Sequence, residues 1–374
     1  MEAPTFVAPD MKIKDIIQQL EQLAPPSLQE NYDNSGLLIG SKDDETSGAI
    51  VCLDCTEEVI DEAIASGFHL IISHHPIIFS GLKKINGKNY VERIVIKAIK
   101  NNIAIYAIHT NLDNVYEGVN QKIASRLGLI NTSILSPKNQ LLCKLVTFAP
   151  LTGAETIRNA LFAAGAGSIG KYSDCSFSSQ GMGTFKAGTG AQPYVGSINE
   201  KHLEPEERIE VILENHLQNA VIAALKNAHP YEEVAYDVYP LLNSHQLIGS
   251  GLIGDLKAPV DTMEFLKSLK KTMLTSCVRY TKVVKDQVSR IAVCGGSGSF
   301  LFNDAKASGA DVFITADYKY HQFFDADGQL VIADIGHYES EQFTGEILAG
   351  FLSNKFPTFA VRLTKVNTNP VNYL

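Results

Sequence analysis

The pattern of hydrophobic and polar positions alternates between strand-like and helix-like periods over the first third of the chain. Short runs rich in Val, Ile and Leu predict buried strands at 49–53, 69–73 and 103–108. Amphipathic periodicity predicts helices at 12–23, 56–66, 90–100 and 118–127. Because continuous apolar strands between helices need cover on both faces, this order predicts a largely parallel α/β sheet.

The last third of the chain repeats this organisation. Strands are predicted at 290–294, 311–315, 330–335 and 359–364. A glycine-rich turn follows the first of them and opens a helix, and further helices are predicted near 318–326 and 338–353. The two outer parts of the sequence therefore have the same α/β character.

The middle of the chain has a different element order. A strand and a helix are followed by a Gly/Ser-rich region with two short strand candidates, and then by strand, helix and strand. Two βαβ-like halves of this kind predict a ferredoxin-like α+β unit. We therefore expect a leader at 1–10 and an α/β domain in two pieces, 11–134 and 246–374, interrupted by an insert at 135–245.

Composition narrows the class of protein. The chain has 374 residues, of which 45% are hydrophobic and 20% charged, as in a soluble globular protein. Its net charge of −9 argues against nonspecific nucleic-acid binding, which needs a basic face. The sequence has neither a long apolar run for a membrane span nor a signal-peptide pattern at its start, so no membrane partner is expected.

The six cysteines are scattered, and the close pair "CLDC" (52–55) runs from a predicted strand into a helix cap. That position favours small buried thiols over a redox or zinc motif. Free thiols of this kind indicate a reducing compartment, so we expect a cytoplasmic protein.

Three groups of metal-ligating side chains each follow a predicted strand. In an open α/β sheet, ligands bind beyond the carboxyl ends of the strands, so groups far apart in the sequence can converge there. A single "HH" pair is more often a surface pair, but three such groups together favour a metal site. The candidates are His74 and His75, His109 and Asp113, and His337 and Glu341.

The spacing within these groups suits a pair of ions. His337 and Glu341 are four residues apart, which puts them on one helix face. His74 and His75 are adjacent and must point in different directions in an extended segment, so each could serve a different ion. Five nitrogen and oxygen ligands exceed what one catalytic metal needs, and Glu341 is the best bridging carboxylate. Zn²⁺, Mn²⁺, Fe²⁺, Co²⁺ and Ni²⁺ all fit such donors.

Other features leave alternatives open. The turn "CGGSGSF" (294–300) could cradle an anion or be a plain tight turn. His321 could shuttle protons or contact substrate, or be an ordinary surface histidine. His109 could support the metal ligands or cap a helix. The stretch "AHPYEEVAYDVYP" (228–240) suits a structural turn and strand, or else a ligand or interface role.

The motifs together resemble the Nif-three-like proteins, known as GTP cyclohydrolase 1 type 2 homologues. The resemblance covers roughly residues 11–134 and 246–374, in order, and includes the early stretch "YDNSGLLIG" (32–40). The other motifs that carry it are "SHHP" (73–76), "HTNLD" (109–113), "GGSG" (295–298), "KYH" (319–321) and "GHYESE" (336–341).

This resemblance implies a dinuclear site, a homohexamer of stacked trimers, and an insert. The family's metal ligands fall on His74, His75, Asp113, His337 and Glu341. The metal sites are expected to face the internal cavity of the hexamer. The middle segment is similar to the PII/CutA-like module of longer members, most recognisably at "HPYEEVAYDVYPL" (229–241).

Two hypotheses for function follow. The first is a hydrolase with two divalent metal ions per subunit, in which a metal-activated hydroxide attacks an electrophilic carbon. Glu341 and His321 are its candidate catalytic residues, and the family label makes the carbon C8 of GTP. A phosphoester or another small molecule is the rival substrate. The second hypothesis is a non-enzymatic, metal-binding oligomeric scaffold or regulator with a ligand-sensing insert.

Overall fold

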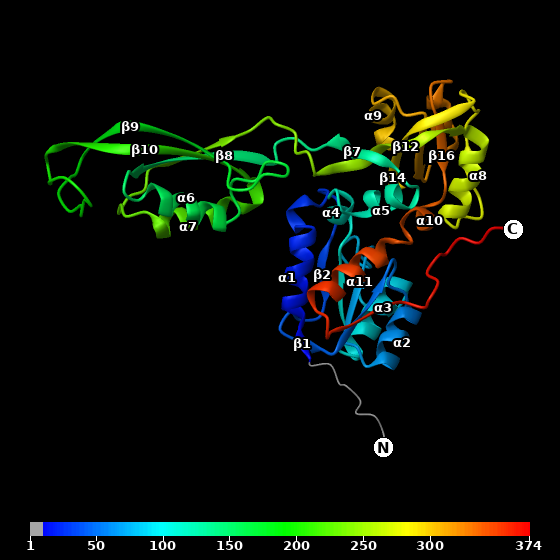
Figure 1. The fold of residues 1–374 in the computed structure, drawn as a ribbon. Coiled ribbons are helices and arrows are strands. Elements are labelled where there is room, and N and C mark those ends of the chain that lie inside the picture. The colour runs from blue at the N-terminus through cyan, green and yellow to red at the C-terminus, as the bar shows by residue number, and fades with distance from the viewer. Residues whose placement is uncertain (1–9) are drawn as a thin grey trace, which may run out of the picture. The chain divides into compact units, whose positions relative to one another are not determined.

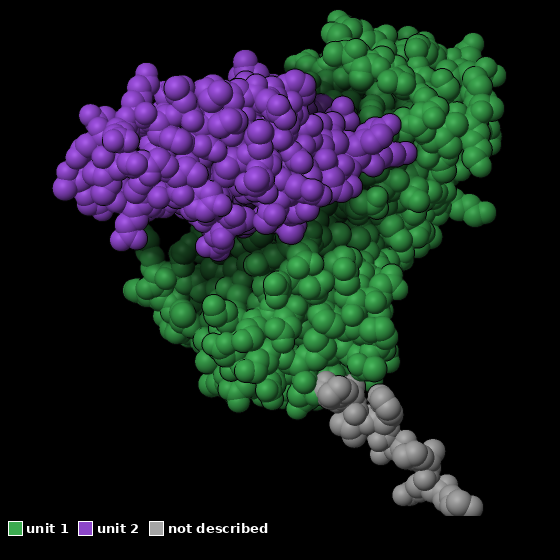
Figure 2. All heavy atoms as spheres, turned by 60° about the vertical axis from the view of Figure 1, so that its left-hand side comes forward, with its two compact units in different colours: residues 1–136, 248–374 green, residues 137–247 purple. Residues whose placement is uncertain are grey.

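The structure is a computed structural model that describes residues 10–374. It divides into two compact units (Figure 2). Unit 1 joins the chain up to Ser136 with Ile248–Leu374, and unit 2 is Pro137–Leu247. The expected insert at 135–245 has nearly the same ends as unit 2. The expected leader at 1–10 lies, except for Asp10, outside the described residues.

The first sheet of unit 1 is mainly parallel. Its strands run in the order β17 (Ala360–Leu363), β4 (Gly48–Cys52), β5 (Leu70–Ser73), β6 (Ala104–Ala107) and β2 (Gly36–Ile39). Only the β2–β6 pairing is antiparallel among these. Strands β4, β5 and β6 are buried at every residue, as their continuous apolar sequences predict.

Helices cover this sheet, and local sequence signals fix several of their ends. The Thr56 side chain accepts a hydrogen bond from the Val59 N–H and so caps α2, while Gly67 ends that helix in the left-handed region. The elements around the sheet are α1 (Ile13–Leu23), α2 (Glu57–Ser66), α3 (Tyr90–Lys100), α11 (Thr344–Lys355), the short turn η1 (Pro26–Leu28) and the strand pair β1 (Met11–Lys12) and β3 (Glu45–Thr46). Two further helices, α4 (Thr110–Asp113) and α5 (Val119–Arg126), contact the second sheet.

The second sheet of unit 1 mixes parallel and antiparallel strands. Their order is β13 (Arg279–Tyr280), β16 (Val331–Asp334), β15 (Val312–Ala316), β14 (Gln287–Ser297), β12 (Gly249–Asp261) and β7 (Ile130–Pro137). Strands β14, β15 and β16 are parallel, so their carboxyl ends share one edge. The accompanying helical segments are α8 (Thr262–Thr272), η3 (Ser299–Leu301), α9 (Phe302–Ala307), η4 (Tyr320–Ala326) and α10 (His337–Glu341).

Unit 2 is an antiparallel sheet with the strand order β11, β8, β10, β9. Figure 1 shows α6 and α7 on one face of this sheet. The chain order β-α-β-β-α-β with this strand order is ferredoxin-like, which confirms the fold class predicted for the insert. The elements are β8 (Leu142–Pro150), α6 (Ala154–Ala163), β9 (Ser176–Lys186), β10 (Lys201–Glu214), η2 (Asn215–Leu217), α7 (Gln218–Ala228) and β11 (Tyr236–Pro240).

Several predicted elements differ in detail. The single helix expected at 338–353 is two helices, α10 and α11, and the helix expected near 318–326 is the 3₁₀ segment η4. The two short strands expected in the Gly/Ser-rich region are one long strand, β9, and the first half of β10. Within residues 10–374, none of the helices combines the length and apolar character that crossing a bilayer requires.

Replacing Phe313 with alanine is expected to destabilise unit 1 by about 3–5 kcal/mol. The Phe313 side chain is fully buried in the core of the second sheet, so its removal leaves a cavity. Native-state hydrogen exchange of the β15 amides measures the loss. Phe300, which is 66% exposed on η3, is the matched control, and Phe300→Ala should change the exchange by less than about 0.5 kcal/mol.

Candidate metal centre

His74 and His75 lie on an extended segment that continues β5. The His74 N–H donates to the carbonyl of Cys52 at 3.1 Å, and the His75 N–H to that of Leu53 at 2.9 Å. Successive side chains of an extended segment alternate in direction. The His74 side chain is accordingly buried, whereas that of His75 is 21% exposed. The adjacent imidazoles therefore take different positions at the end of one strand.

Two short helices supply the remaining ligands. Asp113 ends α4, which follows β6, while His337 and Glu341 begin and end α10, which follows β16. Gly336 precedes α10 with a φ of 93°, and a Cβ there would lie 2.2 Å from Glu339 Oε2. Only glycine fits this turn, which brings α10 directly over the strand end.

The five predicted ligands meet at one point. Glu341 Oε2 lies 3.0 Å from His75 Nε2 and 3.1 Å from His337 Nε2. The same oxygen is 4.0 Å from His74 Nε2, which is 3.5 Å from Asp113 Oδ1. Three groups of three candidate ligands, each with its ligand atoms within 4.8 Å of one another, occur here. Two of these groups share Glu341, and the third is His74, His75 and His109.

Two buried atoms at this point lack a hydrogen-bond partner among the described residues. They are His74 Nε2 and Asp113 Oδ1. The Asp113 side chain as a whole is 25% exposed, but this oxygen is enclosed. A buried polar atom without a partner is costly, and a bound cation would satisfy both. Imidazole nitrogens and carboxylate oxygens are the donors that divalent transition metals accept, so the residues fit a metal.

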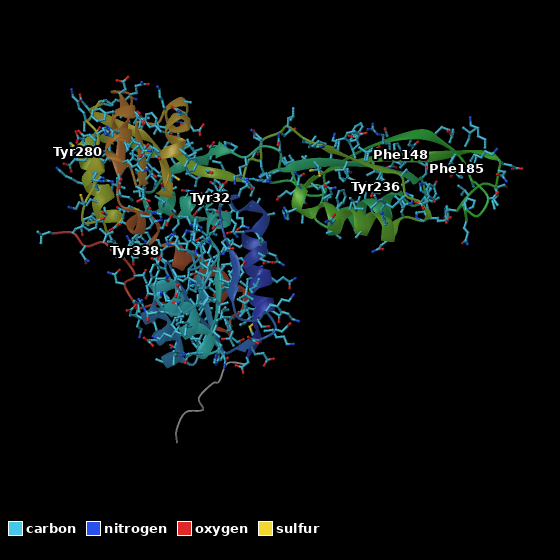
Figure 3. The ribbon with its side chains drawn as sticks, turned by 180° about the vertical axis from the view of Figure 1, so that it is seen from behind. Tyr32, Phe148, Phe185, Tyr236, Tyr280 and Tyr338 are labelled. Atoms are coloured by element: carbon cyan, nitrogen blue, oxygen red, sulfur yellow. The ribbon has the colours of Figure 1, made fainter. Side chains whose placement is uncertain are left out.

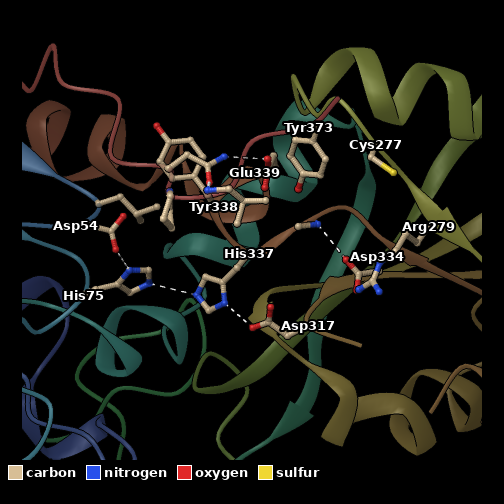
Figure 4. A pocket seen from close by; sticks show the side chains of 15 residues that line it. Asp54, His75, Cys277, Arg279, Asp317, Asp334, His337, Tyr338, Glu339 and Tyr373 are labelled. Atoms are coloured by element: carbon tan, nitrogen blue, oxygen red, sulfur yellow. Dashed lines mark hydrogen bonds and ion pairs between the residues drawn. The ribbon is translucent and has the colours of Figure 1, made fainter. Parts of the chain in front are cut away.

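Hydrogen bonds made by the Nδ1 atoms, on the side of each ring away from the centre, orient the imidazoles. When Nδ1–H donates to an oxygen, Nε2 is left free to face the centre, which fixes the tautomer that a metal needs. Figure 4 shows two of these partners, Asp54 and Asp317, at either end of a chain through His75 and His337. The four pairs are His75 to Asp54 (2.7 Å), His337 to Asp317 (2.6 Å), His109 to Asp33 (2.8 Å) and His74 to the carbonyl of Ile108 (2.8 Å).

The electrostatics of the metal-free centre follow from these contacts. Burial lowers the pKa of His74 to about 3. Burial also disfavours charge on His75 and His337, but hydrogen bonds to Asp54, Asp317 and Glu341 outweigh it and raise their pKa values to about 10 and about 11. Burial and the nearby Glu341 charge raise the pKa of Asp113 well above its usual range.

Glu341 itself remains ionised. Burial raises its pKa, but hydrogen bonds from His337 and His75 hold that pKa well below the usual range. At neutral pH the metal-free centre therefore holds one carboxylate between two imidazolium rings, with His74 neutral.

The supporting carboxylates Asp54 and Asp317 were not assigned roles from the sequence, although a signal for them was present. Asp54 comes two residues after β4 and Asp317 directly after β15, so the strand-end rule that found the histidines also covers them. Asp33, which supports His109 and also accepts from Thr110, lies in the early loop "YDNSGLLIG". No strand directly precedes Asp33, so the rule that ligands follow strand ends does not point to this residue.

The glycine-rich turn at 294–300 packs against the candidate metal centre, and three of its backbone N–H groups already donate to side chains. Gly296 N–H donates to Ser340 Oγ, Gly295 N–H to Asn120 Oδ1, and Gly298 N–H to Thr315 Oγ1, each at 2.9 Å. A Cβ on Gly296 would lie 2.4 Å from Glu341 Oε1. The anion-cradle alternative is therefore not supported, and close approach to Glu341 explains the glycine.

The structure places His109 next to the candidate ligands but does not do so for His321. The His109 ring lies 5.2 Å from that of His74 and 5.3 Å from that of His75, so it borders the centre. His321 lies on η4 as an exposed residue, with its ring 6.4 Å from that of Phe324. The structure does not bring His321 to the metal ligands, and its expected catalytic role gains no support from this arrangement.

The C-terminal segment closes one side of the site. Thr368 Oγ1–H donates to Asp54 Oδ2 at 2.9 Å, and Asn369 Nδ2–H donates to Glu339 Oε1 at 3.0 Å. Thr368 is thus linked through Asp54 to His75. Tyr373, from the same segment, joins Arg279 and Cys277 in lining a pocket of about 490 Å³ beside His75 and His337 (Figure 4).

Comparison with known proteins identifies the family. The model of the Duf34/NIF3 (NGG1p interacting factor 3) family matches residues 11–370. The chain belongs to this family. The resemblance inferred from the strand-end motifs is thereby confirmed.

Family members of similar length are closely related to this chain. A protein of Halalkalibacterium halodurans named "GTP cyclohydrolase 1 type 2 homolog" is 40% identical over 365 residues, or 96% of this chain and 98% of that protein. One of the same name from Bacillus subtilis is 38% identical over 367 residues, with the same coverage. A solved structure, the Bacillus cereus protein related to NIF3, matches with a TM-score of 0.86 and 40% identity over 98% of this chain and all of that one.

Metal binding by this NIF3-family protein is expected to release protons. In the metal-free protein, His75 and His337 have pKa values of about 10 and about 11, so both are protonated at pH 7 and must lose a proton to bind a metal. Affinity should therefore rise with pH and level off above these values. Calorimetric titration with Zn²⁺ in buffers of different ionisation enthalpy should give a release of about two protons or more at pH 7. Binding without proton release would contradict the charge state described above.

Asp54→Asn is expected to weaken metal affinity about 10–100-fold, because an amide orients the His75 imidazole less well than a carboxylate. Thr368→Val should produce a smaller loss of the same kind through Asp54, and Thr368→Ser should restore affinity because it keeps the hydroxyl. Competition with a chromogenic chelator measures these affinities. Equal affinity of the Val and Ser variants would show that the Thr368 hydroxyl has no part in orienting His75.

Proposed function

We propose that this NIF3-family protein is a metal-dependent hydrolase with two divalent ions per subunit. One ion would be held by His74, Asp113 and Glu341, and the other by His75, His337 and Glu341. The observation that carries the proposal is the Glu341 carboxylate, which belongs to two of the three groups of candidate ligands. A carboxylate shared in this way is the usual bridge of a two-metal site.

The ions, when bound, would supply a hydroxide near neutral pH by lowering the pKa of a water, and they would polarise an electrophilic group of the substrate. The residues of the chain hold the candidate ligands in position around the ions. Asp54 and Asp317 keep the His75 and His337 Nε2 atoms aimed at the centre. The donor set admits Zn²⁺, Mn²⁺, Fe²⁺, Co²⁺ or Ni²⁺.

The pocket beside His75 and His337 is the candidate substrate site. Its volume of about 490 Å³ is within the range of small-molecule sites. The relatives' name makes GTP the first substrate to test, with ring opening at C8. The pocket itself is rich in carboxylates, and its arginine, Arg279, already pairs with Asp334. The side chains of the pocket therefore provide little positive charge to bind a triphosphate. A phosphoester or a less charged compound is the alternative substrate.

A non-enzymatic role as a metal-binding scaffold or regulator is the second candidate function. The observation that favours it is a separate pocket of about 570 Å³ lined entirely by residues of unit 2. A sensor domain would need such a site away from the metal centre.

The assembly and compartment also belong to the proposal. We expect a homohexamer of stacked trimers, and the exposed aromatic side chains of Tyr280 on β13 and of Tyr320 and Phe324 on η4 are consistent with contacts between copies. All six cysteines, which lie in the described part of the chain, are free, and four are buried. Free thiols support a reducing, cytoplasmic environment.

The test combines metal analysis with turnover. The full chain loaded with Mn²⁺ or Zn²⁺ should contain about two metal equivalents and should hydrolyse GTP or a member of a phosphoester panel. His75→Ala should lower turnover at least about 100-fold while leaving the oligomeric state unchanged by sedimentation. His69→Ala is the matched control, because His69 lies just before the opposite end of β5 and its ring hydrogen-bonds to the Asn102 carbonyl, not to a candidate ligand.

His321→Ala separates the two readings of that residue. Unchanged turnover would fit its position on η4, whereas a loss as large as that of His75→Ala would establish the predicted catalytic role. One metal equivalent per chain, or turnover that survives His75→Ala, would rule out the two-metal hydrolase.

A further inference from the structure

The insert's sheet has one face that its helices do not cover. Along β10, Ile209 and Val211 point into the core formed with α6 and α7, so the residues between them point to the other face. Glu206 and Arg208 are on that open face. Phe148 of β8 lies directly opposite Arg208 in the strand pairing and shares its side.

A pocket of about 570 Å³ is built on this open face. Figure 3 shows two of its residues, Phe148 and Phe185, on the insert. The segment 187–195, between β9 and β10, and the segment 231–235, between α7 and β11, provide the rest of its wall. All of the lining residues belong to unit 2, so the pocket is independent of the metal centre.

The wall formed by the "HPYEE" segment (229–233) is held in place by a buried histidine. His229 Nε2–H donates to the Phe148 carbonyl at 2.9 Å, and His229 Nδ1 accepts from the Tyr231 N–H at 3.1 Å. The Tyr231 ring then lies 6.0 Å from that of Tyr194 across the pocket. Aromatic groups from four places in the chain, counting Phe185, therefore line a preformed cavity.

Carboxylates dominate the charge of this pocket. Glu206 Oε1 accepts from the Tyr231 hydroxyl at 3.0 Å, and a Cβ on Gly183 would lie 2.0 Å from Glu206 Oε2, so the glycine makes room for this carboxylate. Glu232 and Glu233 also line the pocket, and Lys186 is the basic lining residue. The pocket is thus lined by three carboxylates and one ammonium group.

We propose that this pocket binds a small organic cation, an ammonium compound with an apolar or aromatic body. Aromatic faces attract cations through their quadrupoles, and the attraction strengthens where water is excluded. The carboxylates add charge complementarity, and an anion of the same size would lose hydration and meet three carboxylates against the single ammonium group of Lys186. This inference does not depend on the proposed hydrolase, since it uses none of the metal ligands.

The probe for the test is benzyltrimethylammonium, with benzylsulfonate as the matched anion. The full chain is titrated with each compound, and binding is followed by ligand-observed NMR. We expect saturable binding of the cation below about 10 mM and at least about tenfold weaker binding of the anion. Glu206→Gln, which keeps an acceptor for the Tyr231 hydroxyl, and Tyr194→Leu should each weaken cation binding at least about fivefold.

Glu207→Gln is the matched control, because it removes the same charge from the next residue of β10. The Glu207 carboxylate pairs with Arg158 of α6 on the helix side of the sheet. Equal binding of cation and anion, or equal effects of the Glu206 and Glu207 variants, would overturn the proposal. If a second copy of the chain covers this face instead, the cation will not bind and Glu206→Gln will change the sedimentation coefficient, which would also refute it.

Discussion

A buried carboxylate must have positive charge beside it, and this requirement governs the centre of unit 1. Glu341 is almost completely buried, at 3% exposure, where its charge would be very costly alone. Imidazoles delivered by two different sheets, His75 from the first and His337 from the second, compensate it in the metal-free protein. The same contacts join the first sheet of the α/β unit to its second sheet, although His75 and His337 are 262 residues apart in the sequence.

This arrangement relates metal binding to the stability of unit 1. Without metal, ion pairs through Glu341 hold the strand ends together, but His74 Nε2 and Asp113 Oδ1 remain buried without partners. Bound cations would replace the imidazolium charges and satisfy both atoms, so metal should stabilise the folded state by mass action. The candidate metal centre is therefore also a structural junction between the two sheets.

Much of the fold and of the candidate ligands could be predicted because the determining signals are local. Apolar runs mark the buried strands, and polar residues directly after them mark the edge at which ligands meet. The sequence also contains signals for helix α8, which was not predicted. Asp261 caps α8 by accepting from two backbone N–H groups, and Phe265, Leu266 and Leu269 form its buried face. Strand β12 was harder to predict, because its exposed second half contains Pro259 and lacks a regular apolar pattern.

Other features depend on contacts that sequence pattern does not encode. Nothing in "VNTNP" (366–370) indicates that Thr368 would reach Asp54, more than 300 residues earlier along the chain. The sequence pattern likewise did not indicate that His321 would lie exposed on a 3₁₀ segment, η4, instead of on a regular helix. Tertiary packing decided both outcomes.

The segment 367–373 has a consequence for how this protein can diverge from its relatives. Thr368 and Asn369 lie in no helix or strand, and their side chains reach Asp54 and Glu339. A substitution in this segment would change a support of His75 without replacing a candidate ligand or a core residue of either sheet. Selection can therefore act on the properties of the centre through a loop, while the two sheets stay as they are.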